Sequence, residues 1–236
     1  MRKWLCFFLL FSIIASAQNI LSSLKSSEIL AKARSNYGES GHSRIKQWLD
    51  FIDATENKNE WQKINLVNDF FNEKVIYRTD ELLWNKKDYW ASPIETLGVG
   101  MGDCEDYVIA KYFTLVALGV PEDKIRLMYV RQQTVNQPHM VLIYLERSNE
   151  PPMVLDNFET RLLPANARRD LTPIYSFNSK GLWLAKAKGL GNKIKDSNGK
   201  DSNGVSAWDT MLERIEQGEL ALPAQNKGTI SYAKTF

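Results

Sequence analysis

Apolar residues recur at helical spacing in the first third of the chain. In one segment they stand at positions i, i+3, i+4 and i+7, the pattern of one helix face, and these residues are Ile45, Trp48, Leu49 and Ile52. The next segment continues the period at Trp61, Ile64, Phe71 and Val75. Both stripes predict amphipathic helices that bury their apolar faces in a core.

The segment 104–118 predicts a helix of a different kind. It ends at Gly119, with Pro121 just beyond, as helices commonly do, and its few polar residues are Glu105, Asp106, Lys111 and Thr114. A helix that is apolar on nearly all sides is a buried one. Cys104 then stands at the amino-terminal end of a central helix, with Asp103 as the expected N-cap.

Three strand-like runs follow this helix, at 125–131, 139–146 and 153–158, and they are rich in Val, Ile, Leu, Met and Tyr. The turn-forming segment 147–152 separates the last two runs, which predicts an antiparallel hairpin. A helix followed by antiparallel strands indicates an α+β fold. We expect the central buried helix that bears Cys104 to pack against the antiparallel sheet.

The segment 1–17 has the features of a secretory signal peptide. Arg2 and Lys3 precede an apolar run at 4–14, and small residues suited to cleavage follow at 15–17. The run is too short to span a bilayer and no second long apolar stretch follows, so we expect no direct membrane insertion. Cys6 stands at the start of the run, whereas a lipid-attachment motif belongs at its end.

The chain from 18 to 236 is long enough for a single domain with a substantial core. We expect a helical amino-terminal part at about 18–80, then the central helix and its sheet at about 81–190, and finally a C-terminal helix and a tail that is mobile after Gly218. The doubled turn sequence at 196–204 lacks the closing Glu of a calcium loop and predicts a surface loop.

The charge of the chain argues against some partners. There are 30 Lys and Arg residues against 28 Asp and Glu residues, and two of the basic residues lie in the predicted signal peptide. The mature chain is therefore balanced in charge. This balance gives no electrostatic reason to expect nucleic acid or an anionic membrane surface as a partner.

Cleavage of the predicted signal peptide removes Cys6, so Cys104 is the one cysteine that remains. No disulfide can then form within the chain, in a compartment where disulfides are usual. An unpaired cysteine in that setting indicates a reactive thiol. The alternatives are a buried, inert cysteine and a bridge to another chain.

His139 and Asp156 are the candidate partners of that thiol. The hairpin turn lies near the midpoint between them, so folding brings the two side chains close together. An acid in an apolar strand is costly to bury without a partner. We expect Asp156 to hold the Nδ1 proton of His139, which leaves Nε2 to accept the proton of Cys104. A purely structural histidine is the alternative, and the other histidine, His42, is expected to be exposed just before a helix.

These residues suit nucleophilic acyl transfer. A helix amino terminus favours a thiolate and offers the backbone N–H of Cys104 to an oxyanion. However, the carboxylates of Asp103, Glu105 and Asp106 should raise the pKa of the thiol unless a cation neutralises them. Calcium suits such oxygen ligands, with magnesium as the alternative, and Asp88 upstream is a further candidate ligand. In the other interpretation the acids only complement the helix dipole and face solvent.

At this point the sequence resembles a known family, the bacterial transglutaminase-like cysteine proteinases. The resemblance covers about 61–184, and the residues that carry it are Gly102-Asp103-Cys104-Glu105-Asp106-Tyr107, His139 and the stretches 88–95, 110–112, 118–119 and 155–157. It implies a papain- or transglutaminase-like fold with a triad of Cys104, His139 and Asp156. It also implies calcium bound near the nucleophile by Asp103 and Glu105.

The resemblance further implies a biological setting. Within the family the chain is most similar to periplasmic, calcium-dependent proteases that release large surface adhesins. The implied substrate is a di-alanine site near the amino terminus of a large repeat adhesin, whose release promotes biofilm dispersal. The implied regulator is an inner-membrane receptor for cyclic-di-GMP that sequesters the protease.

Other functions are compatible with the same residues. A transglutaminase or a cell-wall amidase uses the same triad and forms the same kind of acyl-enzyme, and differs only in the acceptor. A calcium-dependent, non-catalytic binding protein is the non-enzyme alternative. Trp84 and Trp90 would lie on the contact surface of such a protein, or otherwise in the core.

Overall fold

A computed structural model describes residues 26–147, 149–184, 193–196 and 205–224. The predicted signal peptide, with Cys6, and nearly all of the doubled turn sequence lie outside the described residues. Within them, every helix is too short or too polar to cross a membrane.

The two amphipathic stripes lie on α2 (Ser27–Thr55) and α3 (Glu60–Lys74), as the periodicity predicts. Trp61 departs from the pattern, since it stands in the first turn of α3 and is 45% exposed. Within α2 the backbone bends at Gly38, whose φ of 68° only glycine adopts at low cost. His42, expected before a helix, lies inside α2 and is half-buried.

The predicted strands join a seven-stranded antiparallel sheet with the order β6-β5-β4-β3-β7-β8-β9. Its strands are β3 (Ile125–Gln132), β4 (Gln137–Tyr144), β5 (Met153–Leu155), β6 (Leu163–Pro164), β7 (Leu171–Asn178), β8 (Gly181–Leu184) and β9 (Lys193–Asp196). The predicted hairpin is confirmed, because β4 pairs with β5 and Leu142 lies opposite Leu155. However, β5 is shorter than predicted and Asp156 follows it. The carboxylate of Asp156 accepts the N–H of Phe158, which turns the chain away from the ladder.

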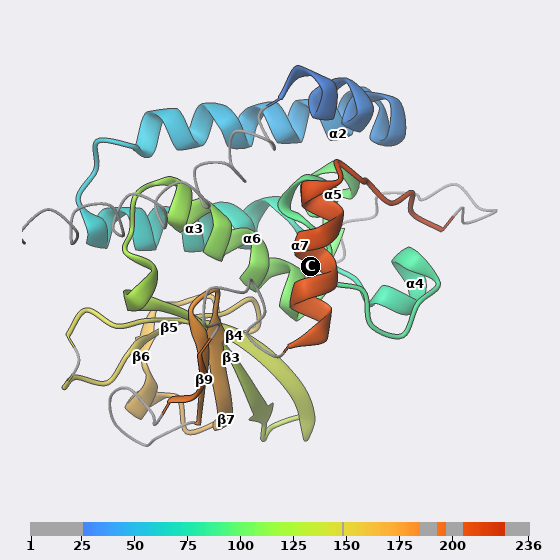
Figure 1. Ribbon diagram of the computed structural model, residues 1–236. Coiled ribbons are helices and arrows are strands. Elements are labelled where there is room, and N and C mark those ends of the chain that lie inside the picture. Colours follow the sequence, from blue (N-terminus) through green and yellow to red (C-terminus); the bar gives the residue numbers. More distant parts are fainter. Residues whose placement is uncertain (1–25, 148, 185–192, 197–204, 225–236) are drawn as a thin grey trace, which may run out of the picture.

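The helices cover one face of the sheet (Figure 1). On β4, Met140, Leu142 and Tyr144 join the main core with the helices, while the alternate residues belong to a smaller cluster on the other face. The helix predicted to be central is α6 (Cys104–Ala117). It contacts α3, α5 (Pro93–Val99) and strands β3 and β4, and it is buried from Asp106 to Leu115. The α+β prediction of a buried helix against an antiparallel sheet is therefore confirmed.

Short elements surround the start of α6. β1 (Ile76–Tyr77) pairs in parallel with β2 (Met101–Gly102), and α4 (Asp80–Trp84) follows β1 directly. The one-turn helices η1 (Glu122–Lys124) and η2 (Ala165–Ala167) connect other parts of the fold. Trp84 and Trp90 are buried, each 7% exposed, so both contribute to the core.

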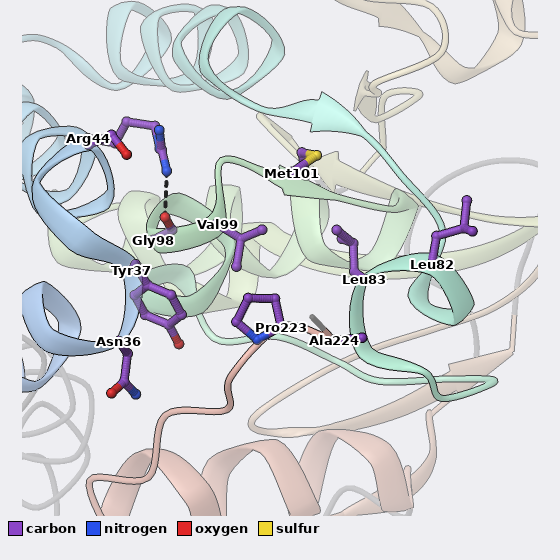
Figure 2. Close-up of a pocket in the computed structure, with 11 residues that line it drawn as sticks. Asn36, Tyr37, Arg44, Leu82, Leu83, Gly98, Val99, Met101, Pro223 and Ala224 are labelled. Carbon is purple, nitrogen blue, oxygen red and sulfur yellow. Dashed lines mark hydrogen bonds between the residues drawn. The ribbon is translucent and has the colours of Figure 1, made fainter. Parts of the chain in front are cut away.

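The last helix among the described residues is α7 (Ser206–Glu216). A mobile tail was predicted after Gly218, but the chain packs against the molecule as far as Ala224, and 225–236 lie outside the described residues. The N–H of Ala224 donates to the carbonyl of Leu83 at 2.6 Å, and the hydroxyl of Tyr37 donates to the carbonyl of Ala221 at 2.7 Å. Figure 2 shows this end of the chain beside Tyr37 and Leu83, at a cavity of about 250 Å³. The segment is ordered because its backbone groups find partners on α2 and α4.

Candidate active site

Cys104 is the first residue of α6, two residues after β2. Asp103 occupies the N-cap position, as predicted, and its N–H donates to Oδ2 of Asp106 at 3.3 Å. Gly102 permits this arrangement, because a Cβ at that position would lie 2.7 Å from the Cβ of Asp106. The Gly-Asp-Cys-Glu-Asp motif thus folds into a tight strand-to-helix junction with the thiol at the end of the helix.

The thiol of Cys104 is half-buried in a negative environment. Its S–H group donates a hydrogen bond to Oε2 of Glu105 at 3.0 Å. The sulfur also accepts a hydrogen bond from the backbone N–H of Met140, the residue after His139 on β4. Burial, followed by the charges of Glu105 and Asp103, raises the pKa of the Cys104 thiol well above its ordinary value. The conflict predicted between the helix terminus and the flanking acids is therefore present in the structure.

His139 and Asp156 are hydrogen-bonded to each other. The distance from Nε2 of His139 to Oδ1 of Asp156 is 2.8 Å, and both residues are buried. The sequence analysis predicts Nδ1 of His139 as the partner of Asp156, whereas in the structure the partner is Nε2. Because Asp156 lies in the turn after β5 and not in the strand, its carboxylate reaches Nε2, which leaves Nδ1 as the ring nitrogen available to the thiol.

Arg168 is the second partner of Asp156 and was missed from the sequence. Its Nη2 donates to Oδ2 of Asp156 and to Oδ2 of Asp170, each at 2.7 Å. Burial opposes ionisation of Asp156, but hydrogen bonds from His139, Phe158 and Arg168 lower the pKa of this carboxyl to about 2. A buried carboxylate needs a cationic or hydrogen-bonding partner. The sequence has several arginines in this region and does not indicate which of them pairs with Asp156.

Cys104 and His139 line one cavity of about 360 Å³. The other residues around it carry no charged side chains and are Tyr77, Gln132, Val135, Gln137, Pro138, Asn157 and Phe158. Tyr77, Val135 and Phe158 are about half exposed at the mouth. In this arrangement a thiol and an imidazole line the same cavity, and the imidazole is hydrogen-bonded to the buried carboxylate of Asp156.

Cys104 also adjoins a group of carboxylates that we call the acidic cluster: Asp80, Asp88, Asp103, Glu105 and Asp106. Carboxylate oxygens of Asp80, Asp103 and Asp106 lie within 4.8 Å of one another, and so do those of Asp80, Asp88 and Glu105. Asp88 is exposed and accepts the indole N–H of Trp90 at 2.9 Å. Asp80 was missed from the sequence, since only the pairing of β1 with β2 brings the start of α4 to this place.

The acidic cluster fits a hard cation. Burial and neighbouring carboxylates raise the pKa of Asp103 to about 10 and that of Asp80 to about 7. Within the described residues, Oδ1 of Asp80 and Oδ1 of Asp103 are buried without a hydrogen-bond partner. Buried oxygens of this kind are the ligands that calcium prefers. The helix-dipole interpretation requires acids that face solvent, and these two oxygens are buried instead.

Comparison with known proteins also indicates a cysteine proteinase. The family model described as bacterial transglutaminase-like cysteine proteinase matches residues 43–179. No curated protein matches the chain. The match includes Cys104, His139 and Asp156, and it favours a cysteine proteinase over a transglutaminase, an amidase or a binding protein.

Solved structures of LapG from Legionella pneumophila are also similar. The calcium-bound structure is 40% identical over 80% of this chain and 97% of that chain, with a TM-score of 0.66. The EGTA-treated structure is 41% identical over 80% of this chain and 96% of that chain, with a TM-score of 0.67. The extent of these matches confirms the resemblance seen in the sequence. The chain therefore belongs to the bacterial transglutaminase-like cysteine proteinases.

Proposed function

We propose that this protein is a calcium-dependent cysteine endopeptidase of the periplasm that cuts a large surface adhesin near its amino terminus. The observation that carries the proposal is one cavity that contains both Cys104 and His139, with the His139 ring held by a buried carboxylate. Family membership supports proteolysis as the reaction. The half-exposed apolar mouth of the cavity suits a polypeptide substrate.

The chemistry assigns a role to each residue. The sulfur of Cys104 attacks the carbonyl carbon of the scissile peptide bond, and its proton passes to Nδ1 of His139. Asp156 holds the Nε2 proton and stabilises the imidazolium, while the backbone N–H of Cys104 donates to the oxyanion. His139 then gives its proton to the leaving amine. Water, deprotonated by His139, hydrolyses the thioester and restores the thiol of Cys104.

Calcium is the cation that we assign to the acidic cluster, with Asp103 and Glu105 as ligands and Asp80 and Asp88 as further candidates. The calcium-bound and EGTA-treated structures of LapG support this choice, as do the unpartnered oxygens of Asp80 and Asp103. When bound, the ion supplies positive charge that offsets the carboxylates beside the thiol. Ionisation of Cys104 is then opposed mainly by its burial.

The wider setting is part of the same proposal and extends the family resemblance of the sequence. We assign export by the signal peptide at 1–17 and a single domain from 18 to 236. The substrate is the amino-terminal region of a repeat adhesin with a di-alanine site, and its release promotes biofilm dispersal. An inner-membrane receptor for cyclic-di-GMP would sequester the protease.

The proposal is tested by incubating wild-type protein and Cys104→Ala, each with calcium, with amino-terminal fragments of candidate adhesins. The masses of the products identify the bond that is cut. Wild-type protein should yield two products whose junction lies between adjacent alanines, and Cys104→Ala should yield none. Equal cleavage by both proteins would remove Cys104 from the mechanism.

A further inference from the structure

Lys111 is a fully buried cation that the proposed chemistry does not use. It lies on α6, two helical turns after Cys104, and its side chain is 0% exposed. Burying an ammonium group is costly unless all of its hydrogen bonds are satisfied. Burial lowers the pKa of Lys111 to about 7, which reflects this cost. A methionine of similar length would fill the same space without the penalty.

The partners of Lys111 are neutral oxygens. Its Nζ donates to Oδ1 of Asn72 at 2.9 Å, to Oδ1 of Asn68 at 3.0 Å and to the main-chain carbonyl of Asp156 at 3.1 Å. An ammonium group has three donors, so all are used. Because none of the three acceptors is a carboxylate, the group is not a buried ion pair.

The two asparagines, one turn apart on α3, bind the same segment. Nδ2 of Asn72 donates to the carbonyl of Asp156 at 2.9 Å, so this carbonyl receives two hydrogen bonds. Nδ2 of Asn68 donates to the carbonyl of Thr160 at 2.8 Å. Asn68, Asn72 and Lys111 therefore hold the turn 156–160 at both ends. This is the turn that takes Asp156 out of the strand and toward Nε2 of His139.

We propose that Lys111 is a positioning residue, which fixes the main chain of Asp156 so that its carboxylate meets His139. Lys111 and Cys104 belong to one rigid helix, so the same element places both the nucleophile and the acid that orients its base. The inference rests on the proposed roles of Cys104, His139 and Asp156. It adds that the buried amine is retained for the geometry of the site and not for the stability of the core.

The test compares Lys111→Met and Asn72→Ala with Thr114→Val. Thr114 is a matched control, because it is buried on the same helix and hydrogen-bonds Trp48 and Ala110 but not the turn 156–160. Two quantities are measured for each protein with calcium: kcat and KM for an adhesin fragment, and the low-field proton resonance of the His139 Nε2–H in its hydrogen bond to Asp156. Unfolding curves are recorded for each variant to test whether it is folded.

Lys111→Met should lower kcat by about 100-fold with KM nearly unchanged, the loss expected when a reacting group is displaced by about 1 Å. Its His139 resonance should shift or broaden, and Asn72→Ala should show both effects more weakly. Thr114→Val should show neither. If Lys111→Met has the same His139 resonance and the same kcat as Thr114→Val, the inference is wrong.

The resonance separates this inference from the proposed function. In one outcome the wild-type protein cleaves no adhesin fragment while Lys111→Met, but not Thr114→Val, loses the His139 resonance. That result would support the positioning role of Lys111 and contradict the proposed substrate. If Lys111→Met does not fold, Asn72→Ala decides, because Asn72 is only half-buried and donates to the same carbonyl. An unchanged resonance and kcat in Asn72→Ala would then overturn the inference.

Discussion

Asp156 is buried and hydrogen-bonds His139, whereas Asp103 is half-buried and directly precedes Cys104, and the pKa values of these two aspartates move in opposite directions. Hydrogen bonds from His139, Phe158 and Arg168 lower the pKa of Asp156 to about 2 in spite of its burial. Burial and neighbouring carboxylates raise the pKa of Asp103 to about 10. The difference is due to the partners, since one carboxylate is saturated by donors of the chain and the other has an oxygen without any.

The comparison shows which half of the site the polypeptide completes by itself. Around Asp156 the fold supplies the imidazole, the guanidinium and the amine, and the geometry is set without help. Around Asp103 the fold gathers acids, and the charged neighbours that act on the pKa of Asp103 are the carboxylates of Glu105, Asp106 and Asp80. We infer that this half depends on an ion from solution, which makes the activity of Cys104 conditional.

The largest effect is expected at the thiol between the two halves. Cys104→Ala should reduce cleavage of an adhesin fragment by at least about 10³-fold, because no other group in the cavity can form the acyl-enzyme. Calorimetry should show calcium binding preserved in this variant, since its acids are intact. Loss of calcium binding together with activity would show that the thiol is part of the ion site.

Breaking the paired half should come next. Asp156→Asn should lower kcat by roughly 10²- to 10⁴-fold, because an amide can hold the ring in the wrong tautomer and cannot stabilise the imidazolium. Asp170→Asn is the matched control, since Asp170 also pairs with Arg168 but does not touch His139. Steady-state kinetics that show equal losses in both variants would mean that the Arg168 network, and not the orientation of His139, limits the rate.

Breaking the unpaired half should have the reverse effect on stability. Without calcium, Asp103→Asn should raise the free energy of unfolding by about 1–3 kcal/mol, because it removes a buried carboxyl that repels its neighbours. Calcium should stabilise this variant less than it stabilises the wild type. Denaturant unfolding with EGTA and with calcium measures both effects, with the exposed Asp50→Asn as control. Destabilisation without calcium would mean that Asp103 has a partner in the free protein.

The smallest effect concerns pH. The pKa of Lys111 is about 7 in the folded protein against an ordinary value of 10.5, so the unfolded chain binds more protons between these values. The free energy of unfolding should therefore rise with pH across this window, and Lys111→Met should lack that part of the rise. Thermal unfolding of both proteins from pH 6 to about 10.5 gives the difference. A difference independent of pH would contradict a buried, titrating amine.

The sequence predicted the parts of the site that lie close together along the chain. The hairpin placed His139 near Asp156, and the apolar run from Cys104 with a carboxylate before it predicted a buried helix with the thiol at its start. The ring nitrogen could not be predicted, because it depends on where β5 ends. Asp80 and Arg168 were also missed, since their positions depend on distant pairings, of β1 with β2 and of Arg168 with the turn after β5.

We propose that a cation bound by the acidic cluster decides whether Cys104 is active. The most direct test measures cleavage of an adhesin fragment and calcium binding by calorimetry, both as functions of free calcium and on the same protein. We expect no cleavage in EGTA and half-maximal cleavage at the calcium concentration that half-saturates the protein. Full cleavage in EGTA, by a protein that still binds calcium, would contradict it.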